Sequence, residues 1–225
     1  EGRATGEAFL DDYAFLIAGL LDLFEVDPDP RWPRQAIALQ ERLDADFADA
    51  AAGGYFFTAA EHEALLTRPK PDDDGALPAG NSVAALNLLR LAELTGDERY
   101  RGRAAGTLRA FGGVLGRAPS ALPAMLCALD FFLDRAKEIV VVSPRARDDR
   151  LLFDTLGRTF VPNRIIVRTT ENEVASLARL APVLAEKIAI GGKPTAYVCE
   201  AMHCELPTSE PAVLAGQLRN ATPLP

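Results

Sequence analysis

The run Glu138-Ile139-Val140-Val141-Val142-Ser143 marks the point at which the sequence changes its period. β-Branched residues fill this run and Pro144 closes it, which is typical of a buried strand. Similar runs and helical patterns alternate after it, at 148–160 (helix), 164–168 (strand), 171–187 (helix) and 195–199 (strand). Strands separated by helices predict βαβ units and a parallel sheet. We therefore expect a small three-stranded βαβαβ segment over residues 136–225.

Before this point the apolar residues follow helical spacing. Five helices are expected, over 8–26, 33–49, 82–94, 97–115 and 119–133. The first, third and fifth are apolar on nearly every face, whereas the second and fourth are amphipathic. Such alternation is what the inner and outer helices of an (α/α) toroid would give, and a plain helical bundle is the alternative. The predicted fold class is α + α/β, with a partial (α/α)6 toroid over residues 1–135 followed by the α/β segment.

Composition and charge narrow the classes of function. The chain has 24 Lys and Arg against 32 Asp and Glu, a net charge of −8, and the excess acid lies in residues 1–135. Phosphates favour the opposite sign, so we expect no nucleic acid or membrane among its partners. No apolar run reaches the ~18 residues of a membrane span, and the first residues lack the profile of a signal peptide. Three cysteines do not make a disulfide scaffold, so a cytoplasmic location is expected.

Two neighbouring carboxylates, Asp11 and Asp12, stand in the first turns of the first helix. Acids at a helix N-terminus complement the helix dipole, and this explains Asp11 well. Asp12 is deeper in the helix and has apolar neighbours. At the mouth of a helical barrel it could be an acid or base, with a pKa raised by those neighbours. Both interpretations of Asp12 stay open.

The densest polar segment covers residues 68–82 and contains the turn dipeptides Asp-Gly and Gly-Asn. One interpretation is a solvated loop that ends in a helix cap. The other is a loop at the mouth of the helical core that contacts a ligand. Its polar groups suited to a sugar-like polyol are Arg68, Lys70, Asp74 and Asn81. The earlier run Gly53-Gly54-Tyr55-Phe56-Phe57 offers either a stacking face for a ligand or aromatic residues that fill the core.

Two cysteines, Cys199 and Cys204, follow the last predicted strand. Their four intervening residues fit neither the redox C-x-x-C motif nor a usual zinc knuckle. His203 and Cys127 are the remaining soft ligands, and without a second cysteine pair no metal is expected. Either the two sulfurs are buried free thiols or they form a labile disulfide. We expect Cα atoms close enough to bridge, within about 7 Å. The chain has no G-x-G-x-x-G, P-loop or G-x-S-x-G motif, and no cofactor is expected.

Taken in order, these segments resemble the spermatogenesis-associated protein 20-like family. The segments that carry the resemblance are 9–17, 53–56, 74–88, 160–163, 197–204 and 207–208. The resemblance is to the C-terminal third of the family, in which a thioredoxin-like domain precedes an (α/α) barrel similar to N-acylglucosamine 2-epimerases. It implies that the thioredoxin-like domain and the first part of the barrel lie outside this chain. Two departures are Ala79, where Ser is frequent in the family, and residues 201–203, where Asn-Phe-Thr is frequent.

The resemblance implies a carbohydrate-active protein, either a sugar hydrolase or epimerase-like. Asp12 and Asp74 would then be the acid and base, because paired carboxylates are the usual requirement of glycoside chemistry. The expected substrate contacts are Tyr13, Tyr55, Arg68, Lys70, Asn81 and Ser82. Epimerases of this type use histidine, for which His62 is a poor match. The alternative is a non-catalytic interaction module or a thiol-redox-linked regulator, in which Cys199 and Cys204 serve a thioredoxin-like partner domain.

Two geometric expectations follow from the toroid. Inner helices run parallel, so Asp12 and Asp74 should lie at the same end of the helical half. Five helices cannot close six hairpins, so the first and fifth helices should each leave an apolar flank without a partner. The residues expected to be incompletely covered are Tyr13, Ile17, Leu20 and Phe24. Soluble monomers rarely expose large apolar patches. The expected partner is therefore the missing N-terminal part of the protein or a second copy of the chain.

Overall fold

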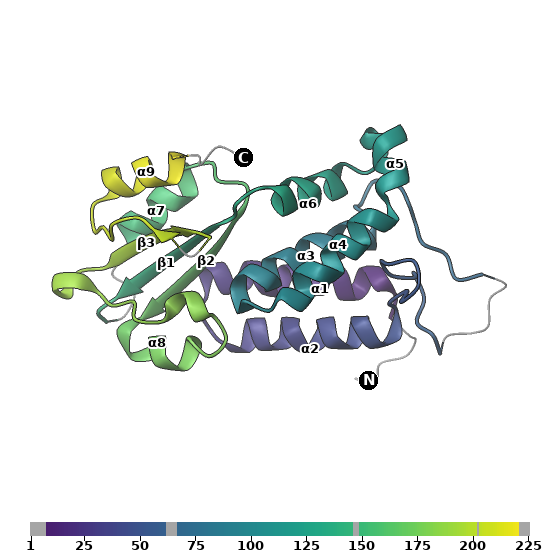
Figure 1. The fold of residues 1–225 in the computed structure, drawn as a ribbon. Coiled ribbons are helices and arrows are strands. Elements are labelled where there is room, and N and C mark those ends of the chain that lie inside the picture. The colour runs from purple at the N-terminus through teal and green to yellow at the C-terminus, as the bar shows by residue number, and fades with distance from the viewer. Residues whose placement is uncertain (1–7, 62–66, 146–148, 202, 221–225) are drawn as a thin grey trace. The chain divides into compact units, whose positions relative to one another are not determined.

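The computed structural model describes residues 8–61, 67–145, 149–201 and 203–220 (Figure 1). The chain forms two units that are each compact. The first unit contains residues up to Asp22, Arg31–Leu89 and Glu98–Leu129, and the second contains Leu23–Pro30, Arg90–Asp97 and residues from Asp130 onward. Within the described residues, no helix is both long and apolar enough to span a membrane.

Helices form where the apolar spacing predicts them. Their bounds are α1 (Leu10–Val26), α2 (Arg31–Asp46), α3 (Gly80–Thr95), α4 (Glu98–Ala110), α5 (Gly112–Arg117), the 3₁₀ turn η1 (Pro119–Ala121) and α6 (Pro123–Leu133). The expected helix over 97–115 is interrupted after Ala110. Gly112 and Gly113 follow there, and glycine costs about 1 kcal/mol relative to Ala inside a helix. The sequence also indicates a short turn of helix over residues 61–66, and all of these residues except Glu61 lie outside the described part of the chain.

Helices α1 and α3 begin at the same end of the first unit. Near their starts, a Cβ at Gly80 would lie 2.6 Å from Cγ of Leu10, so only glycine allows this approach. Further along, the Asn87 side chain donates a hydrogen bond to the carbonyl of Ala14 over 2.8 Å. The contacts advance in the same direction along both helices, so the two helices run parallel. This is the arrangement expected of inner helices.

The expectation about the uncovered flank of α1 is wrong for three of its four residues, whereas the fourth, Tyr13, is half-buried. Ile17, Leu20 and Phe24 are all buried, at 0%, 8% and 2% exposure. The large apolar side chains that α1 exposes lie on another face, and they are Phe15, Leu16, Leu23 and Val26. Because α1 is apolar almost all round, burying one stripe leaves a second one exposed.

The second unit contains a sheet with strand order β2-β1-β3-β4. The strands are β1 (Lys137–Ser143), β2 (Arg164–Thr170), β3 (Thr195–Glu200) and β4 (His203–Cys204). Strands β1 and β2 are parallel, as predicted. The prediction that the third strand is also parallel is wrong, because β3 pairs antiparallel with β1. The two-residue strand β4, too short to be read from a pattern, extends the sheet beyond β3.

The helices between the strands explain this change of direction. They are α7 (Arg150–Arg158), α8 (Glu171–Leu177), the 3₁₀ turns η2 (Pro182–Leu184) and η3 (Ile190–Gly192), and the final helix α9 (Pro211–Arg219). Helix α7 connects the end of β1 to the start of β2, so that the two strands run parallel. Helix α8 ends at Leu177, and only the short 3₁₀ turns η2 and η3 follow it before β3. The chain therefore makes no second helical crossover before β3.

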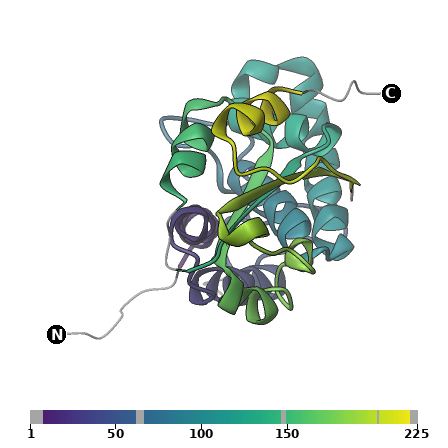
Figure 2. The same cartoon turned by 90° about the vertical axis from the view of Figure 1, so that its left-hand side faces the viewer.

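The two faces of the sheet have different cover. Helices α7 and α9 lie on one face and α8 on the other (Figures 1 and 2). The first face forms the core of the unit from Ile139, Val141, Ile166, Ala196 and Val198 of the strands and Leu152, Leu156, Leu214 and Leu218 of the helices. Since side chains alternate along a strand, Glu138 and Cys199 belong to the opposite face.

Candidate functional site

The carboxylate of Asp74, predicted to be an acid or base, joins two helix N-termini. Its Oδ1 accepts hydrogen bonds from the Ala79 backbone N–H and the Ser82 hydroxyl, each at 2.8 Å, just before and within the first turn of α3. Its Oδ2 accepts a third bond of 2.8 Å from the N–H of Ala124 at the start of α6. Orphan N–H groups at helix starts need such acceptors. Both oxygens of Asp74 and the hydroxyl of Ser82 are therefore used within the fold.

Asp11, rather than Asp12, lies in the more enclosed position at the start of α1. Burial raises the pKa of the Asp11 carboxyl, Asp12 adds to this increase, and a hydrogen bond from the backbone of Gly80 opposes it. Asp11 thus lies at the N-terminus of α3, the same helix end that Asp74 caps. Asp12 is exposed, and its carboxylate accepts a hydrogen bond of 2.8 Å from the N–H of Phe9.

Asn81 and Tyr55 hold each other inside the helical unit. The Asn81 amide pairs with the backbone of Tyr55 in both directions, with two hydrogen bonds of 2.8 Å. The Tyr55 hydroxyl donates to Oδ1 of Asp44 over 2.7 Å and accepts from Gln40 over 3.2 Å. Burial, and then the neighbouring Asp44 carboxylate, raise the pKa of Tyr55. Asn81 and Tyr55 are 0% and 2% exposed, so neither presents its polar group to solvent.

Arg68 and Lys70 bind their own loop. The Arg68 guanidinium lies 4.2 Å from the ring centre of Phe56, and the Lys70 ammonium lies 4.7 Å from it. Lys70 also contacts Oδ2 of Asp49 over 2.6 Å and the carbonyl of Gly53 over 2.8 Å. The hydrogen bond from Lys70, followed by two from backbone N–H groups, lowers the pKa of Asp49 to about 2. The polar groups of these two predicted substrate contacts thus have partners within the protein.

Tyr13, another of the predicted contacts, lines a hollow of the helical unit. Its ring packs 5.3 Å from that of Phe47. The hollow measures about 220 Å³, and its other polar lining residues are Arg42, Asp46 and Glu61. His62, the histidine considered for epimerase chemistry, lies outside the described residues.

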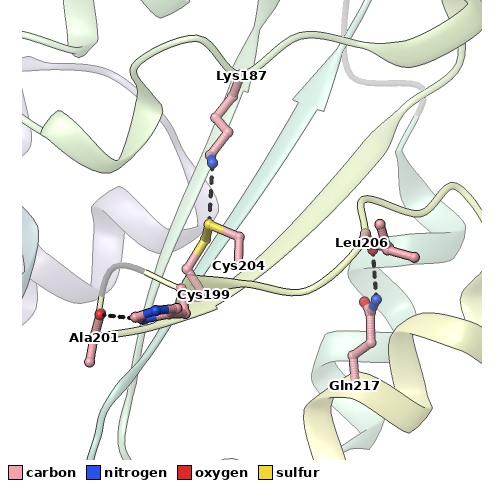
Figure 3. The surroundings of a disulfide bond; sticks show 7 residues. Lys187, Cys199, Ala201, Cys204, Leu206 and Gln217 are labelled. Atoms are coloured by element: carbon pink, nitrogen blue, oxygen red, sulfur yellow. Dashed lines mark hydrogen bonds between the residues drawn. A yellow bond between two sulfur atoms is a disulfide. The ribbon is translucent and has the colours of Figure 1, made fainter.

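Cys199 and Cys204 form a disulfide across the pair of strands β3 and β4 (Figure 3). Their Cα atoms are 3.9 Å apart, which confirms that the two residues are close enough to bridge. The two sulfur-bearing residues differ in access, because Cys199 is 1% exposed whereas Cys204 is exposed. An attacking group can therefore reach the bond from the side of Cys204. Cys127 is a free and exposed cysteine on α6.

A lysine that sequence reasoning missed lies beside the exposed sulfur. Lys187 Nζ is 3.3 Å from Sγ of Cys204, and Figure 3 shows its side chain reaching toward that sulfur. Tyr197 of β3 positions this lysine. Its hydroxyl donates to the carbonyl of Ile188 over 2.8 Å, and its ring lies 4.9 Å below the ammonium group. A cation at this distance lowers the pKa of a thiol and so favours the thiolate.

An acidic residue is the cross-strand neighbour of the buried cysteine. Glu138 of β1 pairs directly with Cys199 of β3 in the antiparallel register, so their side chains share one face of the sheet. Burial raises the pKa of Glu138 to about 7. Glu93 of α3 adds to the increase, and Lys187 opposes it. The sequence feature that could have indicated Glu138 was a single carboxylate next to the β-branched residues of a predicted buried strand.

A hollow of about 410 Å³ adjoins the disulfide at the end of the sheet. Cys204 lines it together with charged residues of both signs, Arg135, Lys137, Glu200 and Glu205. Lys137 and Glu200, opposite each other on β1 and β3, form an ion pair. Among the described residues, no group of three or more His, Cys, Asp or Glu side chains is placed to hold a metal ion.

Comparison with curated proteins finds relatives over most of the chain. Spermatogenesis-associated protein 20 of Homo sapiens is 38% identical over 208 residues, which are 92% of this chain and 26% of that protein. The protein of the same name from Mus musculus is 36% identical over the same shares. Uncharacterized protein B0495.5 of Caenorhabditis elegans is 32% identical over 92% of this chain and 28% of its own length. The chain therefore spans about a quarter of the relatives that it matches. No protein-family model matches it.

Proposed function

Because the chain belongs to the spermatogenesis-associated protein 20-like family and spans about a quarter of its curated relatives, we propose that it contributes a thiol–disulfide exchange site to a larger protein. The site is the Cys199–Cys204 disulfide, and its partner is a dithiol of the thioredoxin-like kind. The single observation that carries the proposal is an exposed disulfide sulfur with a lysine ammonium 3.3 Å away. Exposed disulfides are the labile and regulatory ones.

The disulfide contributes little to holding the two strands together. Cys199 and Cys204 already pair as neighbours between β3 and β4. The bridge closes a loop of only a few residues, and a loop that short stabilises by only about 2 kcal/mol in the chain-entropy account. Reduction would therefore leave the sheet paired and return two thiols of unequal access. Cys204, beside Lys187, is the sulfur that would form the mixed disulfide with a partner.

Single-cysteine variants test this proposal, all in a Cys127→Ser background. Cys199→Ser leaves the thiol of Cys204, and Cys204→Ser leaves that of Cys199. With glutathione disulfide as the probe, Cys199→Ser should form the mixed disulfide at least about tenfold faster, because its thiol is exposed and its thiolate is stabilised by Lys187. Mass spectrometry of quenched samples follows the reaction.

A lysine pair provides the matched control. Adding Lys187→Met to the Cys199→Ser variant should slow the reaction, whereas Lys193→Met, an exposed lysine nearby in sequence, should not. Equal rates for the two single-cysteine variants, or no reaction at Cys204, would refute an exchange site here.

We propose as a second candidate that the helical unit belongs to a carbohydrate-active (α/α) toroid, with α1, α3 and α6 as inner helices. The convergence of their N-termini at Asp11 and Asp74 supports this arrangement. The apolar face that α1 exposes would pack against further helices of the same protein or a second copy. Asp12 and Asp74 would be the acid and base only if Asp74 exchanged one of its bonds for substrate.

Tyr13 offers the simplest test of sugar binding. Calorimetry with a panel of N-acylated and neutral hexoses should detect binding that Tyr13→Ala abolishes and that Tyr197→Phe, in the other unit, retains. Binding that is unaffected by Tyr13→Ala, or no binding to any sugar of the panel, counts against this candidate.

A further inference from the structure

The buried sulfur of Cys199 needs a source of protons when the disulfide is reduced, whereas the exposed sulfur of Cys204 can exchange protons with water. When a thiolate attacks Sγ of Cys204, the bond to Cys199 breaks and its electron pair remains on the Cys199 sulfur. Cys199 is 1% exposed, so water cannot readily reach it to supply a proton. A buried unpaired anion is costly, and the leaving thiolate therefore needs a proton or a cation from the protein.

Glu138 is placed to meet this need. It is the direct cross-strand neighbour of Cys199, and opposite residues of an antiparallel pair have Cβ atoms about 4.5–5.5 Å apart on the same face. Two further charged groups act on Glu138: Glu93 of α3 and Lys187, which follows η2. Lys187 contacts Sγ of Cys204. The same ammonium group thus contacts the exposed sulfur and acts electrostatically on Glu138.

We propose that the Glu138 carboxyl group donates a proton to the Cys199 sulfur as it leaves, and so makes reduction of the disulfide dependent on pH. This inference rests on the proposed exchange function. The first thiolate of a dithiol forms a bond to Cys204, the Cys199–Cys204 bond breaks, and the proton of Glu138 passes to Cys199. The second thiol of the reductant loses its proton to solvent. Its thiolate forms the reductant's disulfide as the mixed disulfide bond to Cys204 breaks, and Cys204 departs as a thiolate beside Lys187. The reductant loses two electrons and the protein disulfide gains them.

The direction of the pH effect follows from the state of Glu138. Its pKa is raised to about 7, so the carboxyl is protonated below that pH and ionised above it. Above pH 7 the leaving sulfur would have no proton donor and would face a carboxylate. The rate constant for reduction, expressed per concentration of reductant thiolate, should therefore fall as the pH rises through 7.

The test is the reduction of the intact chain, carrying Cys127→Ser, by dithiothreitol between about pH 5.5 and 9. Acid quenching, alkylation and mass spectrometry measure the rate. The wild-type site should show a fall of about tenfold centred near pH 7, a modest size for proton transfer by a side chain. Glu138→Gln keeps the shape of the side chain and should give a flat profile. Glu205→Gln, which removes an exposed carboxylate next to Cys204 in sequence, should keep the fall.

The outcomes separate the two proposals. A fall near pH 7 that only Glu138→Gln abolishes supports the proton transfer. If the disulfide is readily reduced and its rate depends on pH in the same way in the wild-type site, Glu138→Gln and Glu205→Gln, the role of Glu138 is refuted. The proposed exchange site is then still supported. A disulfide that dithiothreitol does not reduce at any pH overturns the exchange site and this inference together. Circular dichroism checks that each variant is folded.

Discussion

Asp74→Ala should lower the free energy of unfolding by about 3–5 kcal/mol. The substitution removes the acceptor of three hydrogen bonds, from Ala79, Ser82 and Ala124. Loss of a helix cap costs about 0.5–2 kcal/mol, and a hydrogen bond to a charged group contributes about 1.5–3 kcal/mol. Since one carboxylate serves α3 and α6 together, both helix starts lose their cap at once. Urea unfolding followed by circular dichroism measures the change.

The neighbouring residue provides the control for Asp74. Asp73→Ala removes the same charge from an exposed position one residue earlier, and it should change stability by less than about 0.5 kcal/mol. If Asp74→Ala were as stable as Asp73→Ala, the carboxylate would not be the link between the two helices. Its two oxygens would then be available for chemistry.

Asp149→Ala should destabilise the α/β unit by about 3–5 kcal/mol. The Asp149 side chain is 0% exposed at the start of α7, and it holds Arg168 of β2 through two hydrogen bonds, one of them 2.6 Å long. The Arg168 side chain is 13% exposed, and its guanidinium lies 4.7 Å from the ring centre of Phe153. Removing one partner of such a pair leaves an uncompensated charge, which costs about that amount.

Two further variants serve as controls for the prediction on Asp149. Asp154→Ala breaks an exposed pair with Arg150 on the same helix and should cost no more than about 0.5 kcal/mol. Adding Arg168→Met to Asp149→Ala removes the stranded charge and should recover part of the lost stability. A single variant Asp149→Ala that unfolds at the wild-type urea concentration would contradict this account of the pair.

The sequence predicts the individual helices and strands well, because their formation depends mainly on the spacing of apolar and β-branched residues within each segment. The apolar spacing of residues 8–26 and the β-branched run that begins at Ile139 both form what they predict, as α1 and β1. Strand direction depends instead on how the chain returns to the sheet. The sequence predicts one helix over residues 171–187, whereas α8 ends at Leu177 and β3 returns antiparallel to β1.

The candidate site was harder to predict because the partners of its polar residues are far away in the sequence. Asp74 bonds to Ala124, fifty residues away, and no local spacing indicates such a contact. Lys187 is likewise seventeen residues from Cys204, and Glu138 meets Cys199 only through the antiparallel register. The cysteine pair was predictable as a pair, whereas the lysine and the carboxyl that give it chemistry were not.

The most direct test of the central claim is the equilibrium between the Cys199–Cys204 disulfide and its dithiol. The intact chain is equilibrated with mixtures of reduced and oxidised dithiothreitol, and alkylation with mass spectrometry gives the fraction reduced at each potential. An exchange site that a dithiol protein can reduce should have a midpoint potential above about −300 mV. A disulfide that stays oxidised until well below about −300 mV would be a structural bridge, and the proposed function would be wrong.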